Sequence, residues 1–160
     1  MNKGMTGCGY LPAVDHHMNI KEERSTKEVF EDHIRLRLEG KLEDDLQSNY
    51  SDTVVLLTVK SNAQGHDAIR TSAERLEEQL PQARFEIIEM QTSGHFALLI
   101  WSAESSGMDA VEGSDSFVIE NGKIVFQSIH YGLRRNGWRS CSRGIYRRPW
   151  MVNDAAPKAA

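Results

Sequence analysis

Cysteine and long apolar runs are both scarce in this sequence. Only two cysteines, Cys8 and Cys141, occur among its 160 residues, so we expect neither a disulfide framework nor a cysteine metal site. The adjacent His16 and His17 would diverge on a helix or a strand and give no metal site either.

No segment approaches the roughly 18 apolar residues that a membrane-spanning helix requires. Residues 5–8 are similar to a lipoprotein cleavage site, but no apolar segment precedes them and we expect no such signal. These absences favour a cytoplasmic protein over a membrane protein or a disulfide-rich secreted one.

Internal repeats and low-complexity tracts are also absent, which favours one globular domain for a chain of this length. The net charge is −4, but residues 133–160 carry +6 and the rest of the chain therefore carries −10. Arginines alternate there with Trp138, Tyr146 and Trp150, a composition that can bind single-stranded nucleic acid. No recognisable nucleic-acid module surrounds them. We expect instead that this basic segment packs on its own acidic domain or across a subunit boundary.

The first regular element is expected after a loose arm at residues 1–24, which show no periodicity. In "STKEVFEDHIRLRLEG", Ser25 and Glu28 form a capping box and Gly40 is a suitable C-cap, so the stretch predicts a helix. Its apolar residues fall on one broad arc at 100° per residue. His33 lies within that arc and not on the charged side.

The remaining sequence predicts a short helix at 41–50, a strand at 53–59, a helix at 66–80, and strands at 84–90, 95–103, 114–120 and 123–131. The first of these strands is a continuous β-branched and leucine run, typical of a strand buried on both faces. The polar residues 104–113 predict a loop, and Asn121-Gly122 predicts a hairpin. This order predicts an α+β fold in which helices cover one face of a curved, mainly antiparallel sheet. The second face of residues 96–101 is also apolar, which predicts a homodimer.

One carboxylate interrupts the apolar pattern of the strand at 114–120. Asp115 alternates with Phe117 and Ile119, and side chains two residues apart share a face of a strand. If that face is buried, desolvation raises the pKa of the acid and makes it a proton donor or a general base near neutrality. Alternatively, Asp115 lies at the end of the strand and bonds to backbone amides or an arginine.

Four stretches are similar, in order and spacing, to the nuclear transport factor 2-like superfamily, in particular its SnoaL-like branch. They are "LEGKLEDDLQSNYSDTVVL", "GHDAIR", the tryptophan of "LLIWSA" and "DSFVIENGKIVFQSIHY". The resemblance covers residues 25–132 and divides the chain into an arm at 1–24, this domain, and a basic extension at 133–160. It implies a cone-shaped α+β barrel, with N-terminal helices on a strongly curved sheet, a ligand cavity between them, and often a dimer. The superfamily includes isomerases, cyclases, hydrolases and binding modules, so its fold alone does not give a function.

Within this resemblance, Asp115 matches the buried acid that precedes an aromatic residue in ketosteroid isomerases, where it donates a hydrogen bond to a developing oxyanion. His33 falls about where those enzymes have a helical tyrosine. It could donate to a substrate oxygen, pair with Asp115, or be a satisfied core residue. Thr58, which we expect to line the pocket, stands in the region where the isomerases have their proton-abstracting carboxylate, and this argues against steroid-type double-bond migration. The pattern is closer to polyketide cyclases, in which a single aspartate assists an aldol-type ring closure.

The predicted cavity has aromatic and polar walls. Trp101, Phe117, Ile129 and Tyr131 fit an apolar lining, and Gln127 shares a strand face with Ile129 and Tyr131. A core needs the same residue types, and it is the default interpretation for Phe117 and Ile129. We expect a small-molecule enzyme of the isomerase or cyclase kind that takes a hydrophobic or amphipathic ligand and uses no metal or organic cofactor. The competing prediction is a non-catalytic binding or dimerisation module of the same fold.

Overall fold

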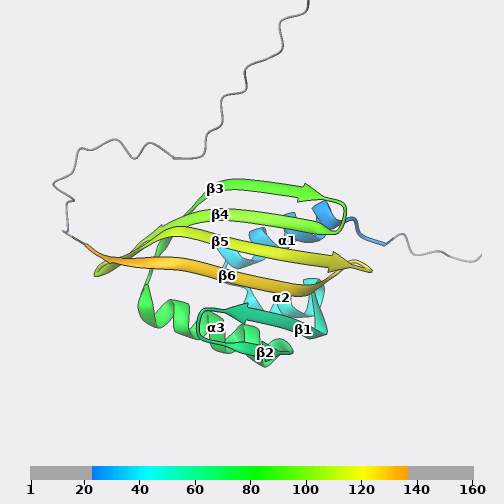
Figure 1. Cartoon of the computed structure of the whole chain (residues 1–160), viewed down its shortest axis with the longest axis horizontal. Coiled ribbons are helices and arrows are strands. Elements are labelled where there is room, and N and C mark those ends of the chain that lie inside the picture. The colour runs from blue at the N-terminus through cyan, green and yellow to red at the C-terminus, as the bar shows by residue number, and fades with distance from the viewer. Residues whose placement is uncertain (1–22, 137–160) are drawn as a thin grey trace, which may run out of the picture.

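A computed structural model describes residues 23–136 of the chain (Figure 1). Most of the predicted arm and of the basic extension lies outside the described residues, as do both cysteines, His16, His17 and the aromatic residues of the extension. In chain order the elements are α1 (Thr26–Leu38), α2 (Leu42–Asn49), β1 (Tyr50–Thr58), β2 (Asn62–Gln64), α3 (His66–Gln79), β3 (Arg84–Ser93), β4 (Phe96–Glu104), β5 (Met108–Glu120) and β6 (Lys123–Arg135).

The six strands form one curved sheet in the order β2-β1-β6-β5-β4-β3. All neighbouring strands are antiparallel except β1 and β6, which run parallel. In Figure 1 the helices α1 and α2 lie behind the sheet, and the face towards the viewer carries no helix among residues 23–136. The structure therefore has the predicted α+β architecture, with a helical layer on one face of a mainly antiparallel sheet.

Helix α1 begins and ends where the sequence predicts. The Ser25 hydroxyl accepts a hydrogen bond from the Glu28 amide at 3.3 Å, and the Glu28 carboxylate accepts one from the Ser25 amide at 2.7 Å. This reciprocal pair is the predicted capping box. Gly40, just beyond the helix, has a φ of +71°, the left-handed conformation that glycine adopts without strain. His33 is buried on the apolar arc together with four apolar residues of α1.

The region predicted as a loop at 104–113 is instead mostly strand, because β5 already begins at Met108. Its polar residues concealed the strand, and its register is irregular between Val111 and Ser114. Glu112 has a φ of +55°, so the chain bulges there and Gly113 returns to the buried face. The predicted hairpin at Asn121 and Gly122 is confirmed, since both residues have positive φ.

The prediction that the strand at 53–59 is buried on both faces is wrong. Val54 and Leu56 are fully buried, whereas Leu57 is 39% exposed, because helices cover only one face of the sheet. The short edge strand β2 was not predicted, since its three residues are polar or small and give no apolar alternation. Strand β6 also continues to Arg135, beyond the predicted limit at 131.

Candidate functional site

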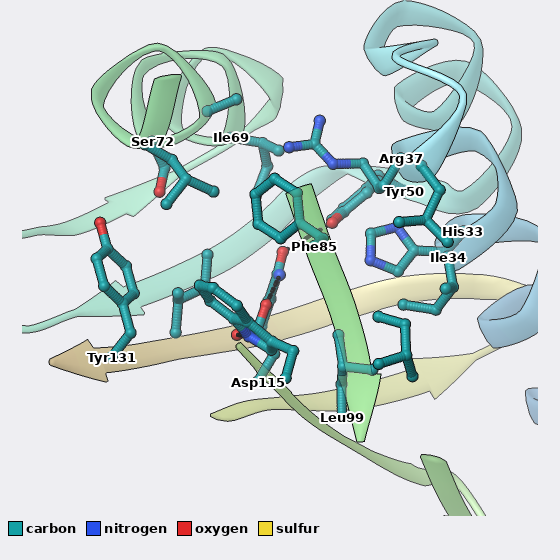
Figure 2. Close-up of a pocket in the computed structure, with 17 residues that line it drawn as sticks. His33, Ile34, Arg37, Tyr50, Ile69, Ser72, Phe85, Leu99, Asp115 and Tyr131 are labelled. Atoms are coloured by element: carbon teal, nitrogen blue, oxygen red, sulfur yellow. Dashed lines mark hydrogen bonds between the residues drawn. The ribbon is translucent and has the colours of Figure 1, made fainter. Parts of the chain in front are cut away.

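Helices α1 and α3 and the inner face of the sheet surround a cavity of about 140 Å³ (Figure 2). Most of its wall is apolar, including Ile34, Leu38, Ile69, Leu76, Phe85, Ile87, Leu99, Trp101 and Ile129. Leu38 is 57% exposed and Phe85 is 37% exposed, so these two residues form a rim through which solvent reaches the cavity. An engineered apolar cavity of about 150 Å³ in another protein binds benzene, so a single ring is the matching ligand size.

Asp115 reaches the cavity from β5. Buried and half-buried residues alternate along this strand, and Gly113, Asp115, Phe117 and Ile119 all lie on the buried face. The carboxyl group accepts a hydrogen bond from Trp101 Nε1 on Oδ1 and one from Gln127 Nε2 on Oδ2, each at 2.9 Å. Two side chains therefore hold this acid within the sheet, and no backbone amide or arginine of residues 23–136 bonds to it.

Burial raises the pKa of Asp115 from its ordinary range to about 6. The hydrogen bonds from Trp101 and Gln127 act in the opposite direction, as do the positive charges of His33 and Arg37. Asp115 is only 7% exposed, and desolvation is the largest of these effects on its pKa. At neutral pH the group is mainly a carboxylate, but it binds a proton much more readily than an exposed aspartate does.

A tyrosine fixes the orientation of Gln127. Tyr50, the first residue of β1, donates its phenolic hydrogen to Gln127 Oε1 at 2.7 Å, which turns the Gln127 amide nitrogen towards Asp115. Burial raises the pKa of Tyr50 well above its ordinary value, so the phenol keeps its proton and remains a donor. The three side chains form a buried chain of hydrogen bonds, Tyr50 to Gln127 to Asp115.

His33 faces the same cavity from α1 but does not bond to Asp115. Its Nδ1 lies 2.9 Å from Oδ2 of Asp45, a fully buried carboxyl group on α2. Oδ1 of Asp45 accepts a hydrogen bond from Asn49 at 2.9 Å. Because a carboxylate only accepts, it selects the His33 tautomer with the proton on Nδ1. Within residues 23–136, Nε2 has no hydrogen-bond partner and is not sealed from solvent, so it is the nitrogen available to a ligand.

The other predicted wall residues divide into two groups. Trp101, Gln127, Ile129 and Tyr131 line the cavity. The rings of Trp101 and Tyr131 are 5.5 Å apart, and the Tyr131 hydroxyl donates to Gln79 Oε1 at 2.6 Å.

Phe117 and Thr58 do not line this cavity. Phe117 lies deeper, with its ring 5.3 Å from Phe30 and 5.2 Å from His33, and it forms part of the core. The Thr58 hydroxyl lies 2.7 Å from that of Ser61 at the turn after β1, and Thr58 lines a separate depression. The position of Thr58 is therefore outside the main cavity, and it carries a hydroxyl group where the related isomerases carry a carboxylate.

Four polar residues of the site were not predicted from the sequence: Arg37, Asp45, Tyr50 and Ser72. Tyr50 ends the stretch at 41–50 that the sequence predicts as a helix, and in the structure it is instead the first residue of β1. Asp45 belongs to an acidic stretch whose neighbours, Glu43 and Asp44, are exposed. Its position directly before the buried Leu46 was the one available sign that it is not on the solvated face.

Residues 23–136 contain no cluster of three His, Cys, Asp or Glu side chains that could hold a metal ion. In the same part of the chain, no helix combines the length and apolar character needed to cross a membrane. The polar side chains that line the cavity, and that a ligand could meet, are those of His33, Arg37, Tyr50, Ser72, Asp115, Gln127 and Tyr131.

The fold and its cavity define a cone-shaped α+β protein of the nuclear transport factor 2-like (NTF2-like) class. The chain belongs to the SnoaL-like domain family, whose profile matches residues 30–127. No curated protein matches the sequence significantly.

Solved structures of low sequence identity share the fold. An NTF2-like protein of Burkholderia thailandensis has a TM-score of 0.59 and 13% identity, over 68% of this chain and 92% of that one. An NTF2-like protein of Cytophaga hutchinsonii has a TM-score of 0.56 and 12% identity, over 71% and 95% of the two chains. A candidate polyketide cyclase of Sinorhizobium meliloti has a TM-score of 0.53 and 18% identity, over 64% and 93%. These matches establish the fold.

Proposed function

We propose that this protein is a small-molecule enzyme of the isomerase or cyclase kind, which moves protons on its substrate with Asp115 and His33 and without a cofactor. One observation carries the proposal: a carboxyl group whose pKa burial raises to about 6 lies in the wall of an apolar cavity that solvent can reach. A general acid or base is most effective when its pKa lies near the operating pH. The cyclase description of the Sinorhizobium meliloti protein agrees with this chemistry.

Asp115 acts as the base. Each of its oxygens accepts one hydrogen bond from the protein and keeps a second lone pair for a substrate proton. Asp115 removes a proton from the carbon beside a substrate carbonyl group, and the electron pair moves to the carbonyl oxygen to give an enolate. Where a carbon–carbon double bond is conjugated with the enolate, the protonated acid returns the proton to the far carbon of the conjugated system, and the double bond shifts. Alternatively, the enolate carbon attacks a second carbonyl group and closes a ring, and the alkoxide oxygen formed there takes the proton from Asp115.

His33 stabilises the enolate oxygen. Asp45 holds the Nδ1 side of the ring, so Nε2 is the atom that meets the substrate. In the protonated ring, Nε2–H donates to the developing negative charge while Asp45 stabilises the imidazolium ion. Trp101 and Tyr131 act as walls that orient the substrate ring.

The test measures proton exchange on a neutral probe. Phenylacetone, a single-ring ketone, is incubated with the protein in deuterium oxide, and exchange of its benzylic protons is followed by NMR. We expect the wild type to accelerate exchange and Asp115→Asn to reduce that acceleration by roughly 10²–10⁴-fold, the usual contribution of a positioned acid–base group. Asp109→Asn is the matched control, because Asp109 lies on the same strand but outside the cavity. Exchange that survives unchanged in Asp115→Asn would remove the proposal.

The second candidate is a non-catalytic ligand-binding module. It is favoured by Thr58, which stands where related isomerases have a carboxylate, and by the protein partners that Asp115 and His33 already have. This candidate predicts that single-ring compounds bind to the cavity of the wild type while the benzylic protons of phenylacetone exchange no faster than in buffer.

We propose further that a second copy of the chain covers the outer face of the sheet. Phe96 on this face is 63% exposed, and the half-buried Leu98 and Ile100 follow it on the same side of β4, so the patch is apolar. By light scattering we expect a dimer for the wild type and a monomer for Ile100→Asp. The control Thr71→Asp, at an exposed position of α3, should remain a dimer. A monomeric wild type at micromolar concentration would contradict this.

We propose the arm at 1–24, the family domain at 25–132 and the basic extension at 133–160, although β6 runs through the second limit to Arg135. Limited proteolysis followed by mass spectrometry tests these limits through the positions of the first cleavages. The small number of cysteines leads us to propose the cytoplasm.

A further inference from the structure

Arg37 places a positive charge at the edge of the cavity. It lies in the last turn of α1, is half-buried, and contributes to the cavity wall. In Figure 2 its side chain extends from α1 towards Ile69 of α3. Within residues 23–136 its guanidinium group forms no hydrogen bond and no ion pair. Arg35 on the same helix, in contrast, bonds to Asp32 at 2.6 Å and to Glu39 at 3.1 Å.

The charge of Arg37 is directed at the interior of the cavity. It lowers the pKa of both Asp115 and Tyr50, against the stronger effect of their burial, so its field reaches the two groups. The wall between these polar groups is apolar. An arginine that has no partner among residues 23–136 and lies beside an apolar cavity offers a fork of N–H donors, which matches the two oxygens of a carboxylate.

We propose that the ligand of this cavity is a small single-ring organic anion whose carboxylate binds Arg37 at the rim while its ring enters the apolar interior. This rests on the proposed function, since it names the substrate class of the same site. The orientation of the ligand in the cavity follows from charge. Its anionic group lies at the Arg37 end, away from the carboxylate of Asp115. An uncharged part of the ligand then lies beside Asp115 and His33. Arg37 lies in the last turn of α1, where the helix dipole is negative, so a monoanion suits the site better than a phosphate dianion.

Benzoate and benzamide test this, because they share ring and size and differ in charge. Calorimetric titration at pH 7 is expected to show that the wild type binds benzoate about tenfold more tightly than benzamide, the usual contribution of a charge-assisted hydrogen bond. Arg37→Gln should remove this preference, and Arg37→Lys should retain part of it. Arg35→Gln is the matched control, because it removes the same charge from the same helix outside the cavity, and it should keep the full preference.

Three results would overturn the proposal: equal binding of both probes to the wild type, a preference that persists in Arg37→Gln, or no binding of either probe. Circular dichroism confirms that each variant is folded, and Arg37→Lys keeps the test valid should Arg37→Gln unfold. The titration requires no turnover, so it is independent of the exchange assay. A benzoate preference without exchange on phenylacetone would contradict the proposed enzyme function and support the anion site. Exchange without the preference would contradict the anion site and support an enzyme that acts on a neutral substrate.

Discussion

The indole ring of Trp101 lies directly over the backbone of Gly113, its partner residue on the neighbouring strand. A methyl group at position 113 would lie 2.4 Å from Cδ2 of Trp101, closer than carbon atoms approach in proteins. In this position the indole Nε1 points at Oδ1 of Asp115, 2.9 Å away. The absence of a side chain at Gly113 thus sets the position of one of the two donors to the buried acid.

Gly113→Ala is therefore expected to displace Trp101. We expect the free energy of unfolding to fall by about 1–3 kcal/mol, the usual cost of overpacking, together with a loss of exchange activity as Asp115 loses a donor. Urea denaturation and the phenylacetone assay measure the two effects. Gly107→Ala is the control, since nothing lies within 4 Å of an added methyl group there. Equal stability of the two variants would mean that the indole is free to move aside.

Gln127→Leu removes the second donor to Asp115. We expect the midpoint of the pH dependence of exchange to rise by roughly one pH unit, because a lost hydrogen bond to the carboxylate favours its protonated form. The variant should also lose about 1–3 kcal/mol of stability, since Tyr50 keeps a buried hydroxyl without an acceptor. Gln91→Leu on the exposed β3 strand is the control. A midpoint that stays near pH 6 would show that Gln127 does not tune the acid.

The raised pKa of Asp115 makes the stability of the protein depend on pH with a defined sign. The folded pKa is about 6, above the unfolded value of about 3.9, so the folded state holds this proton more tightly. Below about pH 3 the group is protonated in both states and costs nothing. As pH rises through 6 it ionises in the buried site, and this costs roughly 3 kcal/mol of stability.

Asp115→Asn isolates this effect from the other titrating groups. The free energy of unfolding of the variant minus that of the wild type should increase by roughly 3 kcal/mol between pH 3 and pH 7.5. His33 and Arg37 face Asp115 and are present in both proteins, so the difference reports mainly on the acid itself. Chemical denaturation across this range is the measurement. Two parallel curves would contradict the raised pKa.

The sequence was sufficient for the parts of the fold that local rules decide. The Ser25–Glu28 capping box and the turn at Asn121 and Gly122 each depend on a few adjacent residues, and both were predicted correctly. The face of Asp115 followed from alternation along one strand. The start of β5 was predicted as a loop because residues 104–113 are polar, and the bulge at Glu112 also interrupts the alternation there.

The site was harder to predict because its contacts join distant parts of the chain. Tyr50 and Gln127 are 77 positions apart, and no local pattern indicates that they meet. Phe117 shares the strand face of Asp115, but two residues along a strand shift a side chain by about 7 Å, which places Phe117 under α1 instead of in the cavity. The pairing of His33 with Asp45 likewise depends on how α1 packs on α2.

Asp45 positions His33, and its removal gives the sharpest test of that role. In Asp45→Asn the side chain at position 45 has no charge, so it no longer stabilises the protonated form of His33 in which Nε2–H donates to the enolate. We expect exchange on phenylacetone to fall by about 10–100-fold, because the enolate loses a preorganised donor while Asp115 remains. The neighbouring Asp44→Asn removes the same charge from an exposed position and should leave exchange unchanged.

Stability alone does not decide the role, since Asp45 is fully buried and its loss is expected to destabilise the fold. The deciding readout is the pH profile: a positioning role predicts that the variant loses the part of the profile that depends on His33, whereas a purely structural role predicts a lower rate with an unchanged profile.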